Sequence, residues 1–357
     1  MKLSLFTEVQ CPPGSSPGQR LQELVEQAER ADALGFDGLW ISEIHFQPEF
    51  SVLSAPYPVL AAISQRTRRL RLGVAVNILA VHHPVHVAEQ AAMLDLLSGG
   101  RMDFTIGRGH PHTRVYEGFG ANREESRSMM EESLKIIHGA WSSEPLEFHG
   151  RFYDIPEIMV NPKPVQKPHP PIYSANTSPD GVEFAAQLDL NVFLPIHTLN
   201  RERLKNLAET YWEKLRAHGH DRSQRELGLL VPIHIADSQE EARRRARQGI
   251  LDYYRVISKT RSEYREWLTK RGSDGATRLP PVPWEGMSFE EICAEHAVLN
   301  DPEGALEELK ALVNDTRATH LLCWMNIGSM THDLVLQSME RFARSVMPAL
   351  RQEFENG

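Results

Sequence analysis

The strongest constraint on the fold is the alternation of short apolar runs with long segments of helical periodicity. Apolar side chains recur every three or four residues over residues 19–34 and 86–97, which predicts amphipathic helices. Ser238 opens a Ser-x-x-Glu sequence typical of a helix start, and a last helix is expected over residues 331–348. The apolar runs between such segments indicate eight buried strands, at residues 3–6, 38–41, 70–76, 102–106, 172–175, 191–194, 229–234 and 319–324.

Strands that are separated by helical crossovers pair in parallel, and eight of them favour closure into a barrel. The rival architecture is a doubly wound open sheet, which usually carries a G-x-G-x-x-G turn after its first strand. Residues 7–18 contain no such turn. We therefore predict an α/β fold, a TIM (β/α)8 barrel with insertion loops, formed by residues 1–357 as a single domain.

Two segments interrupt the alternation. Residues 146–171 hold two short apolar runs around His149 and then a proline-rich tract, which predicts a hairpin followed by an extended loop. Residues 259–286 mix charged residues with Gly and Pro. Because an unstructured insertion of this length in a compact fold is usually a functional lid, we expect a mobile loop at about residues 259–287.

Composition narrows the class of protein. The chain has 39 basic and 48 acidic residues, a net charge of −9, which argues against a nucleic-acid partner. Its cysteines, Cys11, Cys293 and Cys323, are few and far apart, which suits a reducing compartment and indicates neither a disulfide framework nor a zinc knuckle. No apolar run approaches the roughly 18 residues of a membrane span, and the first residues lack the apolar core of a signal peptide. We expect a cytoplasmic enzyme without membrane attachment.

Unusual polar residues follow four consecutive predicted strands. The second strand is followed by Glu43 and His45, the third by Asn77, the fourth by Arg108 and the fifth by residues 176–181. In a parallel barrel the loops after the strand C-termini build the active site. Neighbouring strands lie side by side, so we predict that these residues meet in one sector of the barrel rim.

The loop after the fifth strand has the features of an anion site. Ser178 and Pro179 are typical of an N-cap and a first helical position. The amides of Asp180 and Gly181 would then point out of a helix N-terminus, where a phosphate binds readily. Arg108, between two glycines on the adjacent strand end, can add a charged fork. The alternative is an ordinary capped helix beside a surface arginine.

Glu43 and His45 lie two residues apart on extended chain, so their side chains point to the same side. A carboxylate and an imidazole that face the barrel mouth could transfer a proton or hydrogen-bond to a bound ring. A loop histidine bonded to the backbone is the alternative.

Other histidines raise the question of a metal. His82 and His83 stand where a helix begins, and His110 and His112 form only a His-x-His pattern. No Glu or Cys completes a spaced set of ligands in the sequence, so we predict no metal site. A serine hydrolase is disfavoured because no G-x-S-x-G sequence occurs.

Several short motifs, in order along nearly the whole chain, resemble one known family. The chain resembles the bacterial luciferase-like flavin-dependent monooxygenases, the alkanal monooxygenase family. The resemblance lies in residues 35–40 (GFDGLW), 43–46 (EIHF), 72–76 (LGVAV), 83–85 (HPV), 94–101 (LDLLSGGR), 106–109 (IGRG), 170–173 (PPIY) continuing to 178, 185–186 (AA), 338–342 (SMERF) and 346–348 (VMP).

The resemblance implies a TIM barrel that binds reduced FMN at its C-terminal mouth. It implies a reaction with O2 through a flavin 4a-(hydro)peroxide, which inserts one oxygen atom into a small organic substrate, with the reduced FMN supplied by a separate reductase. The residues at family positions divide by role. Arg108, Ser178 and Gly181 match the phosphate contacts, Ala75, Val76 and Asn77 match a non-prolyl cis peptide region under the flavin ring, and Glu43 and His45 match the catalytic residues beside the ring.

The chain also departs from the luciferase pattern. Luciferase has two successive histidines where this chain has Ile44 and His45, so its proposed base is missing here. The reactive cysteine of luciferase is Gly107, and an acidic flavin contact is Thr177. These departures disfavour light emission from aldehydes and leave the broader monooxygenase function.

Two other functions stay open. One is a hydride-transferring oxidoreductase that uses a deazaflavin, as in a sister branch of the superfamily, and the other is a non-catalytic flavin-binding subunit. The family also implies a homodimer through the second and third helices. Four aromatic side chains and one histidine could either shape the substrate pocket or pack in the core. They are Phe46, Phe50, Tyr57, His110 and Trp324.

Overall fold

A closed barrel of parallel strands forms the centre of the molecule in a computed structural model, which describes residues 1–110, 113–272, 279 and 284–354. Within these residues eight strands close the barrel in the order β1-β2-β3-β4-β7-β8-β9-β11, and β11 pairs with β1. This confirms the predicted TIM barrel. The barrel strands are β1 (Lys2–Thr7), β2 (Gly38–Ile41), β3 (Arg71–Ile78), β4 (Met102–Gly107), β7 (Ile172–Ala175), β8 (Asn191–Pro195), β9 (Leu227–Ile235) and β11 (His320–Asn326), and β10 (Val298–Asn300) adds to the edge of β9.

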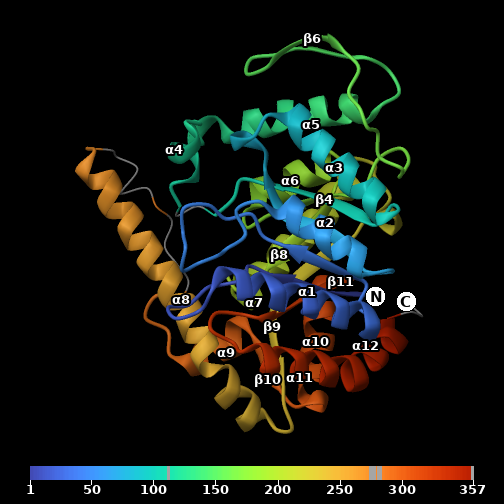
Figure 1. The fold of residues 1–357 in the computed structure, drawn as a ribbon. Coiled ribbons are helices and arrows are strands. Elements are labelled where there is room, and N and C mark those ends of the chain that lie inside the picture. The colour runs from blue at the N-terminus through green and yellow to red at the C-terminus, as the bar shows by residue number, and fades with distance from the viewer. Residues whose placement is uncertain (111–112, 273–278, 280–283, 355–357) are drawn as a thin grey trace.

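Helices surround the barrel on the outside (Figure 1). Residues 331–348, predicted as one helix, instead contain α11, a π-helical turn over Phe342–Val346 and the start of α12. Within the described residues no helix combines the length and apolarity needed to cross a bilayer. The helices are α1 (Pro17–Leu34), α2 (Pro56–Arg66), α3 (Pro84–Ser98), α4 (Val115–Phe119), α5 (Ser126–Trp141), α6 (Pro179–Gln187), α7 (Arg201–Ala217), α8 (Gln239–Lys270), α9 (Phe289–His296), α10 (Pro302–Thr316), α11 (His332–Arg341) and α12 (Met347–Phe354).

Large side chains fill the barrel interior below its mouth. Every residue of β4, β9 and β11 is buried, because helices cover the outer face and side chains fill the inner one. The Trp40 ring packs edge-on against Tyr173, Phe193 and His320. A Cβ at Gly73 would collide with the Trp40 ring, so glycine is needed there. The interior is therefore a packed core, and chemistry is restricted to the mouth.

The first insertion is a hairpin that projects from the barrel (Figure 1). Its strands, β5 (Leu146–His149) and β6 (Asp154–Ile158), pair antiparallel where the sequence predicts a hairpin. Extended chain with cis peptide bonds before Pro162 and Pro168 leads from the hairpin to β7.

The second insertion differs from the prediction. The prediction of an irregular segment over residues 259–286 is wrong for its first part, because residues 259–270 form the last three turns of α8. Thr260, Tyr264 and Leu268 are buried at four-residue spacing, a helical period that the surrounding charged residues obscure. Residues 273–278 and 280–283 lie outside the described residues, and the mobility of the loop stays a prediction.

Candidate active site

The predicted site residues come from adjacent strand ends at the C-terminal mouth of the barrel. β2 pairs with β3, β3 with β4, and β4 with β7, all in parallel, so their C-terminal ends lie on the same rim. Ile106 of β4 lies opposite Ser174 of β7, so Arg108 and Ser178 follow neighbouring strand ends. The predicted meeting of these loops in one sector of the rim agrees with this topology.

The end of β3 contains the non-prolyl cis peptide bond, between Ala75 and Val76, at the position that the family resemblance implies. The β4 chain lies close against it. A Cβ at Gly107 would come within 2.7 Å of the Val76 side chain, and a Cβ at Gly109 would come within 2.7 Å of Ile78. The glycines on both sides of Arg108 therefore permit close packing of β4 against the end of β3.

Asn77 is buried beside this cis peptide and has two partners. Its Nδ2 donates to the carbonyl of Thr105 at 2.9 Å, and its Oδ1 accepts from the Tyr57 hydroxyl at 2.8 Å. Tyr57 is thereby fixed at the rim by a hydrogen bond. Asn77 holds the end of β3 to β4 and its side-chain amide is committed to protein partners.

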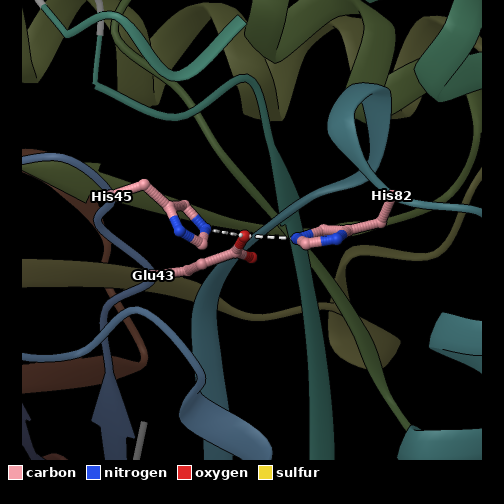
Figure 2. Close-up of side chains that lie close together, drawn as sticks. All are labelled: Glu43, His45 and His82. Atoms are coloured by element: carbon pink, nitrogen blue, oxygen red, sulfur yellow. Dashed lines mark hydrogen bonds and ion pairs between the residues drawn. The ribbon is translucent and has the colours of Figure 1, made fainter. Parts of the chain in front are cut away.

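Glu43 holds two histidines together (Figure 2). Its Oε1 accepts from His45 Nε2 at 2.8 Å and from His82 Nε2 at 2.5 Å. Its Oε2 accepts from the backbone N–H of Ile78 at 3.1 Å. Both imidazoles use Nε2 for the same carboxylate, so their Nδ1 atoms are the ones left for other partners.

Within this cluster, Glu43 and His82 each stabilise the charged form of the other. Burial opposes ionisation of Glu43, but hydrogen bonds from His45 and His82, the His82 charge and the Ile78 amide together hold the Glu43 pKa below its ordinary value. Burial likewise opposes the charged form of His82, but the bond to Glu43 and its negative charge raise the His82 pKa above its ordinary value. The arrangement favours a carboxylate beside a protonated His82.

Sequence reasoning missed His82 as a partner of this site. The premise that no Glu accompanies the histidines is wrong, because Glu43 is distant in sequence from His82 but adjacent in space. Glu43, His45 and His82 offer ligand atoms within 4.8 Å of one another, a carboxylate and two imidazoles that a transition metal could use. Their mutual hydrogen bonds give them an alternative use in holding and moving a proton.

The predicted helix start after β7 is present. Ser178 is the N-cap of α6, Pro179 is in the first turn, and the Ser178 Oγ accepts from the Gly181 N–H at 3.3 Å. The Gly181 amide therefore serves the cap, while the Ser178 hydroxyl hydrogen is free to donate. A Cβ at Gly181 would collide with Asn176, so glycine is needed for the packing of this loop.

Two arginines belong to this end of the mouth. Arg108 is exposed, and its guanidinium makes no hydrogen bond or ion pair with the described residues. Its backbone is anchored by the Tyr116 hydroxyl, which donates to the Arg108 carbonyl at 2.7 Å. Sequence reasoning did not find Arg127 of α5, whose Nη1 donates to the Asp180 carbonyl at 3.4 Å. A helix N-terminus and two guanidinium groups can bind a phosphate.

Two exposed phenylalanine side chains lie close to His45 and His82. Phe119, at the end of α4, lies edge-on to His45 with ring centroids 4.8 Å apart and within 5.8 Å of His82. Phe46 packs against Phe119 at 5.5 Å, and the two side chains remain 50% and 43% exposed. Such apolar exposure beside polar groups is typical of a binding site for an organic molecule.

The other aromatic candidates have different surroundings. Phe50 and Trp324 are fully buried, and both contact Tyr253 of α8, with centroids 6.2 and 4.7 Å from its ring. The His110 ring lies edge-on to Phe50 at 5.1 Å. The Tyr57 hydroxyl donates its hydrogen bond to Asn77.

The fold and this mouth define an α/β-barrel whose C-terminal rim carries the capped start of α6 and a carboxylate–histidine cluster. The luciferase-like monooxygenase family model matches residues 1–320, so the chain belongs to that family. The chain is 27% identical to the oxygenase component of the flavin-dependent trigonelline monooxygenase of Acinetobacter baylyi, over 99% of this chain and 96% of that protein. These relationships confirm the family resemblance and identify the chain as a flavin-dependent monooxygenase.

Solved structures share the fold over the whole chain. The monooxygenase RslO1 of Streptomyces bottropensis has a TM-score of 0.84 and 24% identity, covering 98% of this chain and 100% of that one. The oxygenating constituent of 3,6-diketocamphane monooxygenase of Pseudomonas putida, in complex with FMN, has a TM-score of 0.79 and 21% identity, covering 98% of each chain. An F420-dependent secondary alcohol dehydrogenase also has this fold, with a TM-score of 0.74 and 18% identity over 98% of this chain and 99% of that one. At these identities the likeness concerns the fold alone.

Proposed function

We propose that this chain is the oxygenase component of a two-component monooxygenase, which receives reduced FMN from a separate reductase and oxygenates a small organic substrate with O2. The observation that carries the proposal is that two groups follow neighbouring strand ends, namely the capped start of α6 at Ser178 and Arg108, whose guanidinium has no partner among the described residues. The name of the trigonelline relative, an oxygenase component, and the FMN complex of the diketocamphane monooxygenase support it.

The residues at the α6 end fit the phosphate of FMN. The Ser178 hydroxyl can donate while its oxygen caps the helix, and Arg108 and Arg127 supply positive charge. The Asp180 amide is one of the first-turn N–H groups that a helix leaves without an internal partner. Gly181 contributes through the tight packing of its loop against Asn176. A dianionic phosphate would thus be bound at one side of the mouth.

The chain from Ala75 to Asn77 would support the flavin ring. Ala75 and Val76 are partly exposed at the mouth, whereas Asn77 is buried and fixed by Thr105 and Tyr57. Val76 is packed against Gly107, so the surface under the ring is held rigidly. When bound, reduced FMN supplies the electrons that activate O2 for transfer of one oxygen atom.

His45 would steer proton transfer in the reaction, with Glu43 and His82 holding its orientation and charge. The hydrogen bond to Glu43 fixes the His45 Nε2, so the Nδ1 is the atom available to a ligand at the mouth. Phe46 and Phe119 would exclude water from this atom. Water exclusion is what allows oxygen transfer to compete with release of hydrogen peroxide.

The proposal is tested by binding and by coupling. Titration with reduced FMN and with reduced riboflavin should show a preference for FMN that Arg108→Gln removes. His45→Ala should bind reduced FMN as well as the natural chain, but should release hydrogen peroxide instead of oxygenated product. Equal binding of reduced FMN and reduced riboflavin by the natural chain would contradict the phosphate site. If His45→Ala forms as much oxygenated product per O2 consumed as the natural chain, His45 has no part in the mechanism.

No contact in the described residues favours the two alternative functions over this one. A deazaflavin-dependent hydride transfer would leave the reduced enzyme slow to react with O2, so oxygen consumption with product oxygenation separates the two chemistries. A non-catalytic subunit would bind flavin without turnover. The presence of Glu43, His45 and an Arg108 guanidinium without a partner in the described part of the chain supports the catalytic function.

We also propose a homodimer in the cytoplasm. Met93, Leu96 and Leu97 of α3 and Val165 beside it are about half exposed, and the Gln65 side chain of α2 bonds to the Leu97 carbonyl next to them. An apolar group of this kind on a helix surface suits an interface with a second copy. The cytoplasmic location is a prediction from the cysteine content.

A further inference from the structure

The last turns of α8 contact two walls of the barrel mouth that are far from them in sequence. Thr260, which is 3% exposed, donates from its Oγ1 to the side-chain oxygen of Gln47 at 3.2 Å, and Gln47 directly follows Phe46. One turn further along α8, the buried Tyr264 donates from its hydroxyl to the Glu117 Oε1 of α4 at 2.8 Å. Figure 1 shows this end of α8 on the same side of the molecule as α4. The helix therefore contacts both segments that carry the exposed phenylalanines.

The end of α4 lies against the histidine cluster. The Phe119 ring is edge-on to His45, with ring centroids 4.8 Å apart. Gly118 lies so close to Phe46 that a Cβ at position 118 would come within 2.2 Å of the Phe46 ring. A shift of α4 would therefore move Phe119 away from His45 and change the packing of Phe46. These are the two rings that we expect to exclude water from His45.

α4 has only five residues, and a helix of this length is unstable without outside contacts. Its first two residues are buried in a small apolar cluster apart from the main core, whereas its last three, Glu117, Gly118 and Phe119, are exposed. Burial thus fixes the first half of α4. The hydrogen bond from Tyr264 is a contact that holds the second half, the part next to His45.

Arg123 provides a second link between α8 and α4. Its guanidinium carbon lies 4.5 Å from the ring centroid of Tyr116 and 5.5 Å from that of Tyr264. Its Nη2 donates to the Thr113 carbonyl at 2.8 Å, which fixes the guanidinium beside α4. Burial, opposed by the Arg123 charge, raises the pKa of Tyr264 above its ordinary value, so the hydroxyl keeps the proton that it donates to Glu117.

We propose that Tyr264 and Glu117 are positioning residues of the proposed monooxygenase, and that their hydrogen bond keeps Phe119 beside His45. Both residues act through the placement of Phe119 and not on the reacting atoms. With Phe119 in place, water is kept from the site of oxygen activation, so less O2 is lost as hydrogen peroxide. The inference rests on the proposed function, because retention of oxygen is a property of that reaction.

Hydrogen exchange in the flavin-free chain measures how firmly α4 is held. The amides of Gly118, Gly120 and Ala121 bond to carbonyls of α4 and of its N-cap residue, so their exchange reports the opening of this helix. Tyr264→Phe removes the hydroxyl and keeps the ring. It should speed exchange of these amides about three- to tenfold, the range expected for the loss of one hydrogen bond.

Tyr211→Phe is the matched control for this substitution. The Tyr211 hydroxyl of α7 donates to the Leu190 carbonyl at 2.7 Å, and Leu190 directly precedes β8, at the opposite end of the barrel from the mouth. The control therefore also loses one hydrogen bond from a buried tyrosine. It should leave amide exchange in α4 as it is in the natural chain.

A second measurement uses the chain loaded with reduced FMN. When it is mixed with O2 without an organic substrate, reduced FMN and O2 become oxidised FMN and hydrogen peroxide, and the rate of peroxide release reports how well water is excluded. Tyr264→Phe should raise this rate by about the same three- to tenfold factor. Tyr211→Phe should leave it unchanged.

Substitutions of Glu117 separate the hydrogen bond from the bulk of the side chain. Glu117→Gln keeps an oxygen that can accept from Tyr264 and should match the natural chain in both rates. Glu117→Leu removes the acceptor and should match Tyr264→Phe, and the double variant should exceed neither single variant. The inference is overturned if Tyr264→Phe leaves either rate unchanged, if Tyr211→Phe raises both rates equally, or if Glu117→Gln behaves like Glu117→Leu.

The outcome is separable from that of the proposed function. The exchange measurement contains no flavin, whereas the monooxygenase proposal is tested by reduced FMN binding and by coupling. A chain that binds reduced FMN and couples O2, but in which Tyr264→Phe changes neither rate, loses only this inference. A chain that does not bind reduced FMN loses the monooxygenase proposal, and with it the positioning role of Tyr264 and Glu117.

Discussion

Gly107 lies so close to Val76 that a Cβ at position 107 would come within 2.7 Å of the Val76 Cγ2. Val76 is β-branched and its side chain has little rotational freedom to yield. Val76 also follows the cis peptide bond at the end of β3. The contact therefore fixes the position of the surface on which we expect the flavin ring to lie, and it leaves no room for a side chain at position 107 unless Val76 moves.

Gly107→Ala should disturb this contact. The added methyl group forces Val76 or the strand end to move, which we expect to lower the free energy of unfolding by about 1–3 kcal/mol and to weaken reduced FMN binding. Urea denaturation and a flavin titration measure the two effects. Gly18→Ala in the first turn of α1 is the control, since its Cβ would meet only Ser16 Oγ at 3.7 Å. If the two variants have the same unfolding free energy and the same affinity for reduced FMN, the contact between position 107 and Val76 does not have this role.

The barrel was predictable because its signals are local. Each strand is a run of apolar residues and each crossover shows a helical period, so the eight strands could be located before their pairing was known. The last turns of α8 were missed because charged residues such as Lys259, Glu263 and Arg265 surround a narrow apolar stripe. Composition indicated a loop where the spacing of Tyr264 and Leu268 indicated a helix.

The candidate site was predictable to the extent that its residues follow strand ends. Glu43, His45 and Ser178 could be selected because topology brings strand ends to one rim. His82 and Arg127 could not, because each meets the site through a contact between residues far apart in sequence. Four-residue spacing or a turn motif carries no information about such pairs.

The two functions of Ser178, as helix cap and as phosphate donor, can be separated by substitution. Ser178→Ala should lose the cap to the Gly181 amide, costing about 1 kcal/mol of unfolding free energy, and should also weaken FMN binding. Ser178→Asp should keep the cap, because aspartate is an equally good N-cap, but its charge should repel the phosphate. Thermal unfolding and FMN titration of both variants provide the measurement. Undiminished FMN affinity in Ser178→Asp would show that no phosphate binds at this helix start.

The Glu43–His82 pair should make stability depend on pH. The His82 pKa is raised above its ordinary 6.5, so its contribution is fully present below pH 6.5 and is lost as the pH rises through the raised value. The Glu43 pKa is lowered below 4.5, so its contribution is present above pH 4.5 and is lost as the pH falls through the lowered value. The pair should therefore contribute most between about pH 4.5 and 6.5.

His82→Gln tests this sign. Between pH 6 and pH 9 the unfolding free energy of the natural chain should fall relative to that of the variant, measured by urea denaturation at each pH. Glu43→Gln should lower the His82 pKa, observed by NMR titration of its ring protons, because the negative partner is gone. A difference between the natural chain and His82→Gln that grows with pH would contradict the assignment.

The exposed apolar group on α3 predicts the oligomeric state. The chain should be a dimer in solution, and Leu97→Glu should dissociate it, because a carboxylate in the centre of an apolar interface loses its water without a partner. We expect the dimer dissociation constant to rise by about a hundredfold or more. Light scattering during size-exclusion chromatography, over a range of concentrations, measures this. Met159→Glu is the matched control, since Met159 is equally exposed but lies just beyond β6 in the projecting insertion. A monomeric natural chain, or dissociation by Met159→Glu alone, would assign the α3 surface another role.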